Sequence, residues 1–270
     1  MLSFTDLEVL RHDPHPFHSR VPKTQPQVVV PQDPSVFASQ LLAFRPDARQ
    51  AEILDCADPN LMLLCTRQFG KTTLTAIKAL HFALTHPGAI VLVVSPTARR
   101  SGEWIRVLRG FLITLGLPLK SDRIHAFSAV LPNASRLIGL PGTVNSNRGY
   151  PAHLLIVDEA AFVPDAVYKV LTPSLAATGG AQWLISSAGP ESGFFYEQWR
   201  DTLLPWRRFR VPAGDCPRIS PVFLARERLL LGESAFQQEF LCEFQPGPLT
   251  PITRSLLDAA LDETYLPCSL

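Results

Sequence analysis

The stretch CTRQFGKTT, residues 65 to 73, combines residue types that bind phosphate. It follows the general phosphate-binding pattern GxxxxGK[ST], except that Cys65 stands where the pattern has its first glycine. The essential chemistry is retained: Gly70 lets the backbone approach phosphate, Lys71 supplies a positive charge, and Thr72 can ligate Mg²⁺. An apolar run precedes the loop and a helical pattern follows it. The backbone N–H groups of a helix N-terminus are therefore expected to face the phosphates.

A second chemical signal is the acidic pair Asp158 and Glu159 in the stretch LLIVDEAAF. Nucleotide hydrolysis needs a carboxylate that holds Mg²⁺ and a group that orients the attacking water. We predict that Asp158 holds the metal and that Glu159 polarises the water, a few ångströms from Lys71 across adjoining strands. The competing interpretation is an ordinary strand that ends in two exposed acids, and the phosphate-binding loop counts against it.

The elements that must position these residues follow an alternating pattern. Nearly continuous apolar runs predict buried strands, and segments with a helical apolar stripe separate them. Such an alternation predicts an α/β fold of the P-loop NTPase (RecA/ASCE-like) kind, in which helices cover both faces of a mostly parallel sheet. The predicted strands are residues 61–65, 89–95, 153–159 and 182–187, and the predicted helices are residues 70–86, 98–116 and 165–178.

The flanking segments divide the chain into three parts. Residues 1–40 are rich in proline and are expected to form an N-terminal arm. Residues 41–245 form the predicted ATPase domain, and residues 246–270 form a C-terminal tail. Within the domain, residues 123–141 predict a β-hairpin inserted at the sheet edge. After the last buried strand we expect, in order, a helix at 194–204, a strand at 206–212, a helix at 220–232 and a helix-to-strand element at 233–244.

Other residues stand where a nucleotide would need them. Phe44 is a candidate for stacking on a base and Gln50 for hydrogen-bonding adenine, although the same stretch fits a helix N-terminus. Ser186 and Ser187 follow a strand and could sense the γ-phosphate, with a plain strand end as the alternative. Arg148 could present its guanidinium to a phosphate.

These motifs together resemble the ATPase part of the large subunit of tailed-phage terminases, the motor that packs DNA into capsids. The family's variant loop also lacks the first glycine and carries Arg-Gln before Gly-Lys-Thr, as TRQFGKTT does here. The resemblance covers roughly residues 40 to 245. It includes the stretches FRPDARQ, RGYPAHLLIVDEAAFVPD, ISSAGPESGFFYEQW and FQQEFLCEF.

The resemblance implies an ATP-hydrolysing motor that uses ATP and Mg²⁺. Arg67 would lie against the nucleotide and report its state, and Arg148 would act on the ATP of a neighbouring subunit. Ser186 and Ser187 would couple hydrolysis to movement. The nucleotide is expected to contact Thr66, Arg67, Gln68, Phe69, Gly70, Lys71, Thr72 and Thr73. The implied partners are double-stranded DNA, bound without regard to sequence, other copies of the chain on a portal, and a terminase small subunit.

The chain also departs from the family pattern. The family's large subunit continues into a metal-dependent nuclease domain, which needs several converging carboxylates. Beyond residue 245 the acids are Asp258, Asp262 and Glu263, on one short predicted helix. We therefore expect no nuclease activity and a truncated or split form of the protein.

The composition of the chain limits how it can bind DNA and indicates its cellular compartment. The chain of 270 residues carries 25 Lys and Arg against 24 Asp and Glu, so contact with DNA must come from local basic segments. Residues 97–123 hold six basic residues against two acids, and residues 200–210 hold four against one; solvated helix faces are the alternative reading of both. Five cysteines without a CxxC pair, and the lack of a long apolar run, predict a protein of the bacterial host cytoplasm with no membrane contact.

Two other functions fit parts of the pattern. A helicase-like ATPase would have the same nucleotide core, but such helicases usually carry two cores in one chain and only one is visible. A non-catalytic nucleotide-binding module, the remnant of a prophage, would keep the fold and lose the hydrolysis.

Overall fold

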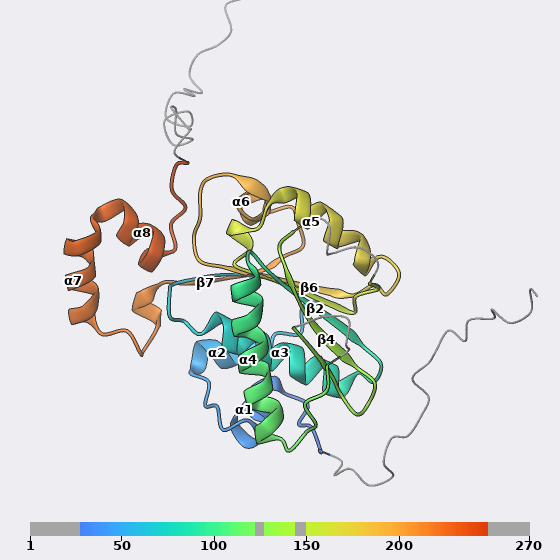
Figure 1. Cartoon of the computed structure of the whole chain (residues 1–270). Coiled ribbons are helices and arrows are strands. Elements are labelled where there is room, and N and C mark those ends of the chain that lie inside the picture. Colours follow the sequence, from blue (N-terminus) through green and yellow to red (C-terminus); the bar gives the residue numbers. More distant parts are fainter. Residues whose placement is uncertain (1–27, 122–126, 144–149, 248–270) are drawn as a thin grey trace, which may run out of the picture.

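The structure, a computed structural model, describes residues 28–121, 127–143 and 150–247, and these form a three-layer α/β fold (Figure 1). Within these ranges the central sheet has seven strands in the order β3-β4-β2-β5-β6-β1-β7. All neighbours are parallel except β3, which runs antiparallel to β4. The strands are β1 Asn60–Cys65, β2 Ile90–Ser95, β3 Ser128–Val130, β4 Arg136–Pro141, β5 Leu154–Asp158, β6 Ala181–Ser186 and β7 Arg207–Val211.

Helices cover both faces of the sheet, as predicted (Figure 1). One face packs against α1 Pro34–Leu41, α2 Ala48–Leu54, α3 Lys71–Thr85 and α4 Ala98–Thr114. The other face packs against α5 Asp165–Leu171 and α6 Gly193–Arg200. Successive strand side chains alternate between these two cores, so that Leu63 belongs to the first and Leu64 to the second. The pair α7 Pro221–Leu231 and α8 Glu233–Leu241 lies beyond β7, at one end of the sheet (Figure 1).

The predicted hairpin is present, and its turn lies between β3 and β4. β3 forms the edge of the sheet, as expected, whereas β4 also pairs in parallel with β2 and so belongs to the main sheet. Among the described residues, no helix combines the length and the apolar character that a membrane span requires.

Helix α1 lies across the boundary that we predicted at residue 40. Pro34 occupies the first turn of this helix, where its missing N–H costs nothing, and Phe37 and Ala38 are fully buried in the core. The carbonyl of Pro31 lies 2.9 Å from His81 Nε2 on α3. The part of the predicted arm that the structure describes is therefore integrated into the fold, because prolines at a helix start do not prevent packing.

Three predicted elements are shorter in the structure. α5 ends at Leu171 and gives way to a 3₁₀ turn at Thr172–Leu175, because Pro173 has no N–H to continue the α-helical ladder. α6 ends at Arg200 rather than near residue 204. After α8, the expected strand is a single bridge between Pro190 and Gln245. Most of the tail, residues 248–270, lies outside the described residues.

Candidate active site

A cleft of about 660 Å³ opens at the edge of the sheet where strands β1, β2, β5 and β6 end. Parallel strands bring their carboxyl ends to one edge, which is where α/β proteins bind ligands. The cleft is lined by Arg67, Gln68, Gly70, Lys71, Thr72, Thr73, Pro96, Thr97, Arg100, Glu159, Phe162 and Ser187. Residues that are distant in the sequence, from the loop after β1 and the ends of β5 and β6, therefore share one concave site.

The loop between β1 and α3 has the backbone that phosphate binding requires. Gly70 adopts φ +94°, and a Cβ at this position would lie 3.2 Å from Gln50 Nε2. Glycine is thus favoured both because the backbone has a positive φ and because a Cβ would crowd the side chain of Gln50. Cys65, in place of the first glycine, is the last residue of β1, is fully buried, and pairs with Val211 of β7. The substitution is accommodated because this position belongs to the strand and not to the part of the loop that lines the cleft.

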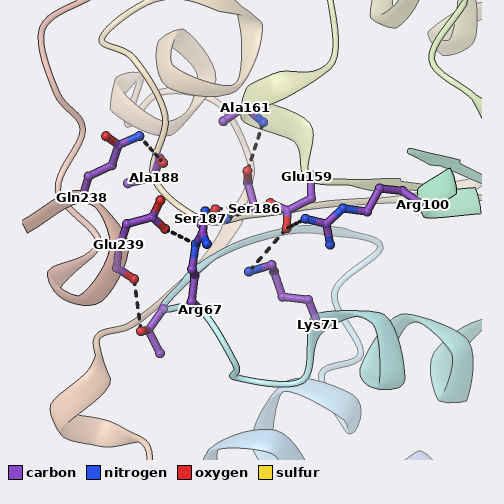
Figure 2. Close-up of polar contacts among 11 residues, drawn as sticks. Arg67, Lys71, Arg100, Glu159, Ala161, Ser186, Ser187, Ala188, Gln238 and Glu239 are labelled. Atoms are coloured by element: carbon purple, nitrogen blue, oxygen red, sulfur yellow. Dashed lines mark hydrogen bonds and ion pairs between the residues drawn. The ribbon is translucent and has the colours of Figure 1, made fainter. Parts of the chain in front are cut away.

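Lys71 and Glu159 face each other across the cleft, with Lys71 Nζ 3.7 Å from Glu159 Oε1 (Figure 2). Both side chains are largely buried. Burial acts to lower the pKa of Lys71, but the neighbouring Cys65, Glu159 and Asp158 more than offset it and raise the pKa. Lys71 therefore remains a cation. β6 lies between β1 and β5, so the expectation of adjoining strands was wrong, although the two side chains still meet.

Glu159 is also tied to the end of β6. Its Oε2 accepts hydrogen bonds from Ser187 Oγ at 3.2 Å and from Ser187 N at 3.4 Å. Ser186 is fully buried, and its Oγ accepts a bond from Ala161 N at 3.1 Å (Figure 2). The backbone of Glu159 is in the left-handed region at φ +53°, which is uncommon for a residue with a side chain. The acid and the segment after β6 thus form one connected unit, with Ser187 and not Ser186 lining the cleft.

Asp158 ends β5 immediately before Glu159 and is almost fully buried. Within the described part of the chain, its Oδ1 has no hydrogen-bond partner. Burial and then the charge of Glu159 raise the pKa of Asp158 to about 7. A buried carboxylate oxygen without a partner is costly and fits a position that a cation would complete. The described residues contain no cluster of three or more His, Cys, Asp or Glu side chains, and Mg²⁺ typically binds one or two carboxylates and keeps several waters.

Behind the loop, the carbonyl of Phe69 accepts two hydrogen bonds, from Gln50 Nε2 at 2.8 Å and from Arg218 at 2.9 Å. Arg218 also forms an ion pair with Asp47 at 2.5 Å, and Gln50 closes a capping box with Asp47 at the start of α2. A trans peptide points its C=O and N–H in opposite directions. Fixing the Phe69 carbonyl on this side therefore directs the Gly70 N–H toward the cleft.

This arrangement bears on the predicted base contacts of Gln50 and Phe44. Gln50 is 1% exposed, and both of its amide atoms bond within the protein, so in this structure it braces the loop and does not present itself to a base. Phe44 is half-buried and packs against the core. The side chain of Phe69 is fully buried, so only its backbone contributes to the loop. The contacts of Gln50 and Phe44 with a base stay a prediction, since the sequence shows which groups can hydrogen-bond but not which of them already have partners.

The start of the loop, Thr66 and Arg67, is bonded to α8. Glu239 Oε2 forms an ion pair with Arg67 Nε at 2.5 Å, and the Glu239 carbonyl accepts bonds from Arg67 N at 3.1 Å and Thr66 Oγ1 at 3.2 Å (Figure 2). Gln238 donates to the carbonyl of Ala188, which follows Ser187, at 3.1 Å. Arg67 lines the cleft as predicted for a residue near the nucleotide, but its charge is shared with α8.

Three residues of the site were not predicted from the sequence: Arg100, Arg218 and Glu239. Arg100 NH2 lies 4.0 Å from Glu159 Oε1, and the residue had been counted only as part of a basic segment. Its position just after β2 was an available signal, since β2 ends at the same edge as β5. For Arg218 and Glu239, no local pattern marks the contact. The predicted phosphate contact by Arg148 falls within residues 144–149, outside the described residues.

The two basic segments differ in their partners. In the segment 200–210, Arg208 donates to the carbonyls of Gln198, Trp199, Asp201, Leu204 and Trp206, and Arg210 donates to the Leu241 carbonyl and pairs with Glu243. These guanidinium groups mainly hold the end of α6 and the end of α8. In the segment 97–123, the exposed side chains of Arg99, Arg106 and Arg109 lie along α4. Arg106 pairs with Glu103 at 2.6 Å, and Arg200 and Arg207 of the other segment are exposed as well, so both segments present arginines to solvent.

Residues 62–244 match the family model for the N-terminal part of the terminase large subunit, T4likevirus-type. No curated protein sequence matches the chain. The large-terminase ATPase domain of Thermus phage P74-26 is 21% identical with a TM-score of 0.66, and the match covers 77% of this chain and 97% of that domain.

Longer terminases show the same fold over part of their length. The large terminase of bacteriophage HK97 is 15% identical with a TM-score of 0.66, covering 78% of this chain and 55% of that one. The large terminase of the thermophilic bacteriophage D6E, in complex with ADP, is 14% identical with a TM-score of 0.60, covering 69% and 48%. This chain thus spans about half the length of these two terminases. Because the family model covers more than half of the chain, the chain belongs to the terminase large-subunit family, of which it matches the T4likevirus-type N-terminal part.

Proposed function

We propose that this chain binds Mg·ATP in the cleft and hydrolyses it, and that this hydrolysis drives DNA translocation in a terminase large subunit. The observation that carries the proposal is the approach of Lys71 Nζ to within 3.7 Å of Glu159 Oε1 across the cleft. A cation at a helix N-terminus and a carboxylate at a strand end, both held largely out of water, are what phosphoryl transfer to water needs.

Each residue has a role in the proposed reaction. The Gly70 N–H, the start of α3 and Lys71 bind the phosphates, which draws Lys71 away from Glu159. Glu159 then accepts a hydrogen bond from a water molecule and aims its oxygen at the γ-phosphorus, so that ADP and inorganic phosphate form. Ser187 keeps the carboxylate oriented through its two hydrogen bonds to Oε2.

Thr72 and Asp158 are the proposed holders of Mg²⁺. The partnerless, buried Oδ1 of Asp158 supports this assignment, as does the position of Thr72 in the cleft lining. When bound, the cation neutralises charge on the β- and γ-phosphates. Its charge would also offset the cost of ionising the buried Asp158, whose pKa burial raises to about 7.

The wider role rests on the family. One relative with this fold, the large terminase of bacteriophage D6E, has been solved in complex with ADP and in complex with ATP-γ-S, which supports nucleotide binding in the cleft. We propose duplex DNA as the translocated partner, contacted without regard to sequence. The exposed arginines of α4 are the candidates for phosphate-backbone contacts. Assembly with other copies on a portal, contact with a small subunit, and action in the host cytoplasm belong to the same proposal.

Steady-state ATP hydrolysis by two variants tests the catalytic assignment. Lys71→Ala is expected to abolish binding and hydrolysis of Mg·ATP. Glu159→Gln is expected to bind Mg·ATP like the wild type while its kcat falls by about 10² to 10⁴, the usual contribution of a positioned acid or base. Lys169→Ala and Glu52→Gln, which alter exposed residues away from the cleft, serve as matched controls. Wild-type rates in both cleft variants would reject the site.

A further inference from the structure

Arg100 stands in the cleft although no sequence motif assigns it a role there. It is the third residue of α4, and its backbone N–H donates to Oγ1 of Thr97, the residue that caps the helix, at 3.3 Å. Trp104 and Leu108 are fully buried and fix α4 against the sheet. The first turn of α4 is therefore a rigid support that directs the Arg100 side chain toward the end of β5 (Figure 2).

Two cations converge on one carboxylate oxygen in this cleft. Lys71 Nζ lies 3.7 Å and Arg100 NH2 lies 4.0 Å from Glu159 Oε1, while Oε2 is held by Ser187. The Arg100 side chain remains 54% exposed, so most of its five donors are not used by this long contact. The amino-terminal end of α4 adds a partial positive charge at the same place. The cleft is thus arranged for an anion with more charge than one carboxylate provides.

The position of Arg100 indicates which phosphate group of a nucleotide it would contact. In phosphate-binding loops the lysine reaches the β- and γ-phosphates, and the glutamate lies beyond the γ-phosphate with the attacking water. Arg100 reaches that same glutamate from α4, on the side of the cleft opposite the α8 contact of Arg67 (Figure 2). It therefore lies at the γ-phosphate end of the site, where ADP has no group.

We propose that Arg100 binds the γ-phosphate of ATP and, in doing so, leaves Glu159 free to orient water. This inference rests on the proposed function and extends it by naming the group that distinguishes ATP from ADP. A phosphate offers two oxygens in the geometry that a guanidinium prefers, and its charge exceeds that of a carboxylate. The long contact to Glu159 is exchanged for a shorter, bidentate one.

Isothermal titration of the whole chain with ATP-γ-S and with ADP, both with Mg²⁺, tests the proposal. Arg100→Ala is expected to weaken ATP-γ-S binding by about 10-fold to 100-fold, the range for a hydrogen bond to a charged group, and to change ADP binding less than about twofold. Arg100→Lys keeps the charge but not the bidentate geometry, and it is expected to recover part of the loss. Arg226→Ala removes an exposed arginine of α7 outside the cleft lining and is expected to match the wild type for both nucleotides.

Four results would overturn the inference. An equal loss for ATP-γ-S and ADP would place Arg100 away from the γ-phosphate. Unchanged nucleotide binding, accompanied by weaker binding of duplex DNA, would assign Arg100 to the basic surface of α4 instead. A wild-type chain that binds neither nucleotide would reject the proposed function itself. A wild type that binds ATP-γ-S no more tightly than Arg100→Ala does would reject only the role of Arg100.

Discussion

The two sides of the phosphate-binding loop are held by contacts of very different quality. On the cleft side, Lys71 and Arg100 approach Glu159 at 3.7 and 4.0 Å, and part of their hydrogen-bonding capacity is unused. On the buried side, the Phe69 carbonyl accepts bonds of 2.8 and 2.9 Å from Gln50 and Arg218. The contacts behind the loop have the distances of normal hydrogen bonds. The contacts across the cleft are longer than hydrogen bonds, so these charged groups can form shorter bonds to a ligand.

The two sets of contacts have different roles: the hydrogen bonds behind the loop hold its backbone, and the ion pairs across the cleft involve the groups proposed to act on the nucleotide. Hydrogen bonds at ideal distance from the buried Gln50 and from the exposed Arg218 fix the peptide between Phe69 and Gly70 before any ligand arrives, which makes a phosphate site preorganised. Longer ion pairs can be exchanged for phosphate at little cost. The comparison therefore predicts that substitutions on the buried side lower stability and substrate affinity, whereas substitutions on the cleft side lower turnover and reduce stability less.

Gln50→Ala gives the largest expected change in stability. It leaves the partly buried Asp47 N–H without its partner in the capping box and removes one of the two donors to the buried Phe69 carbonyl. We expect the free energy of unfolding to fall by about 1 to 3 kcal/mol, the usual cost of leaving a buried polar group unsatisfied. KM for ATP should rise more than kcat falls. Urea denaturation and steady-state kinetics measure the two effects.

Gln237→Ala is the matched control for Gln50→Ala. Gln237 lies on α8, and its Nε2 donates to the exposed Glu233 at 3.1 Å. Its loss is expected to change stability by less than about 0.5 kcal/mol, as is usual for surface substitutions. If Gln50→Ala were as stable as this control and had an unchanged KM, the buried side would not position the loop.

Ser187→Ala is the corresponding change on the cleft side, with a smaller expected effect. It removes the hydroxyl that donates to Glu159 Oε2 at 3.2 Å and keeps the backbone donor at 3.4 Å. We expect kcat to fall about tenfold, the equivalent of one modest hydrogen bond to a charged group, while the free energy of unfolding falls less than in Gln50→Ala because the backbone donor to Oε2 remains. Rapid-quench assays of a single turnover, with a parallel urea titration, make the measurement.

Ser39→Ala controls for the loss of a serine hydroxyl. Ser39 is exposed on α1, and its Oγ donates to the Ser35 carbonyl at 2.9 Å, away from the cleft. Its turnover should equal that of the wild type. A large loss of stability in Ser187→Ala, without a change in single-turnover rate, would contradict the division between the two sides of the loop.

The sequence predicted the parts of the site that depend on local patterns. Lys71 and Thr72 were assigned because a strand, a glycine-containing loop and a helix follow one another in the chain. Asp158 and Glu159 were assigned because an acidic pair ends an apolar run. The parallel sheet then brings these ends to one edge, so the alternating pattern was sufficient to predict that they meet.

The parts that could not be predicted depend on contacts between distant segments. Arg218 reaches the Phe69 carbonyl across 149 positions, and Glu239 reaches Arg67 across 172. No spacing rule links such residues. The arginines of the segment 200–210 were counted by charge, but Arg208 and Arg210 bond to backbone carbonyls, which only tertiary packing reveals. Gln50 was read as a ligand because its amide suits adenine, yet the same amide satisfies the loop behind it.

A structure of the chain with Mg²⁺ and ATP-γ-S tests the central claim most directly. We predict that Lys71 Nζ leaves Glu159 and binds the phosphates, while the bonds from Gln50 and Arg218 to the Phe69 carbonyl keep their lengths. A nucleotide bound elsewhere would contradict the account. So would a nucleotide in the cleft beside an intact Lys71–Glu159 pair.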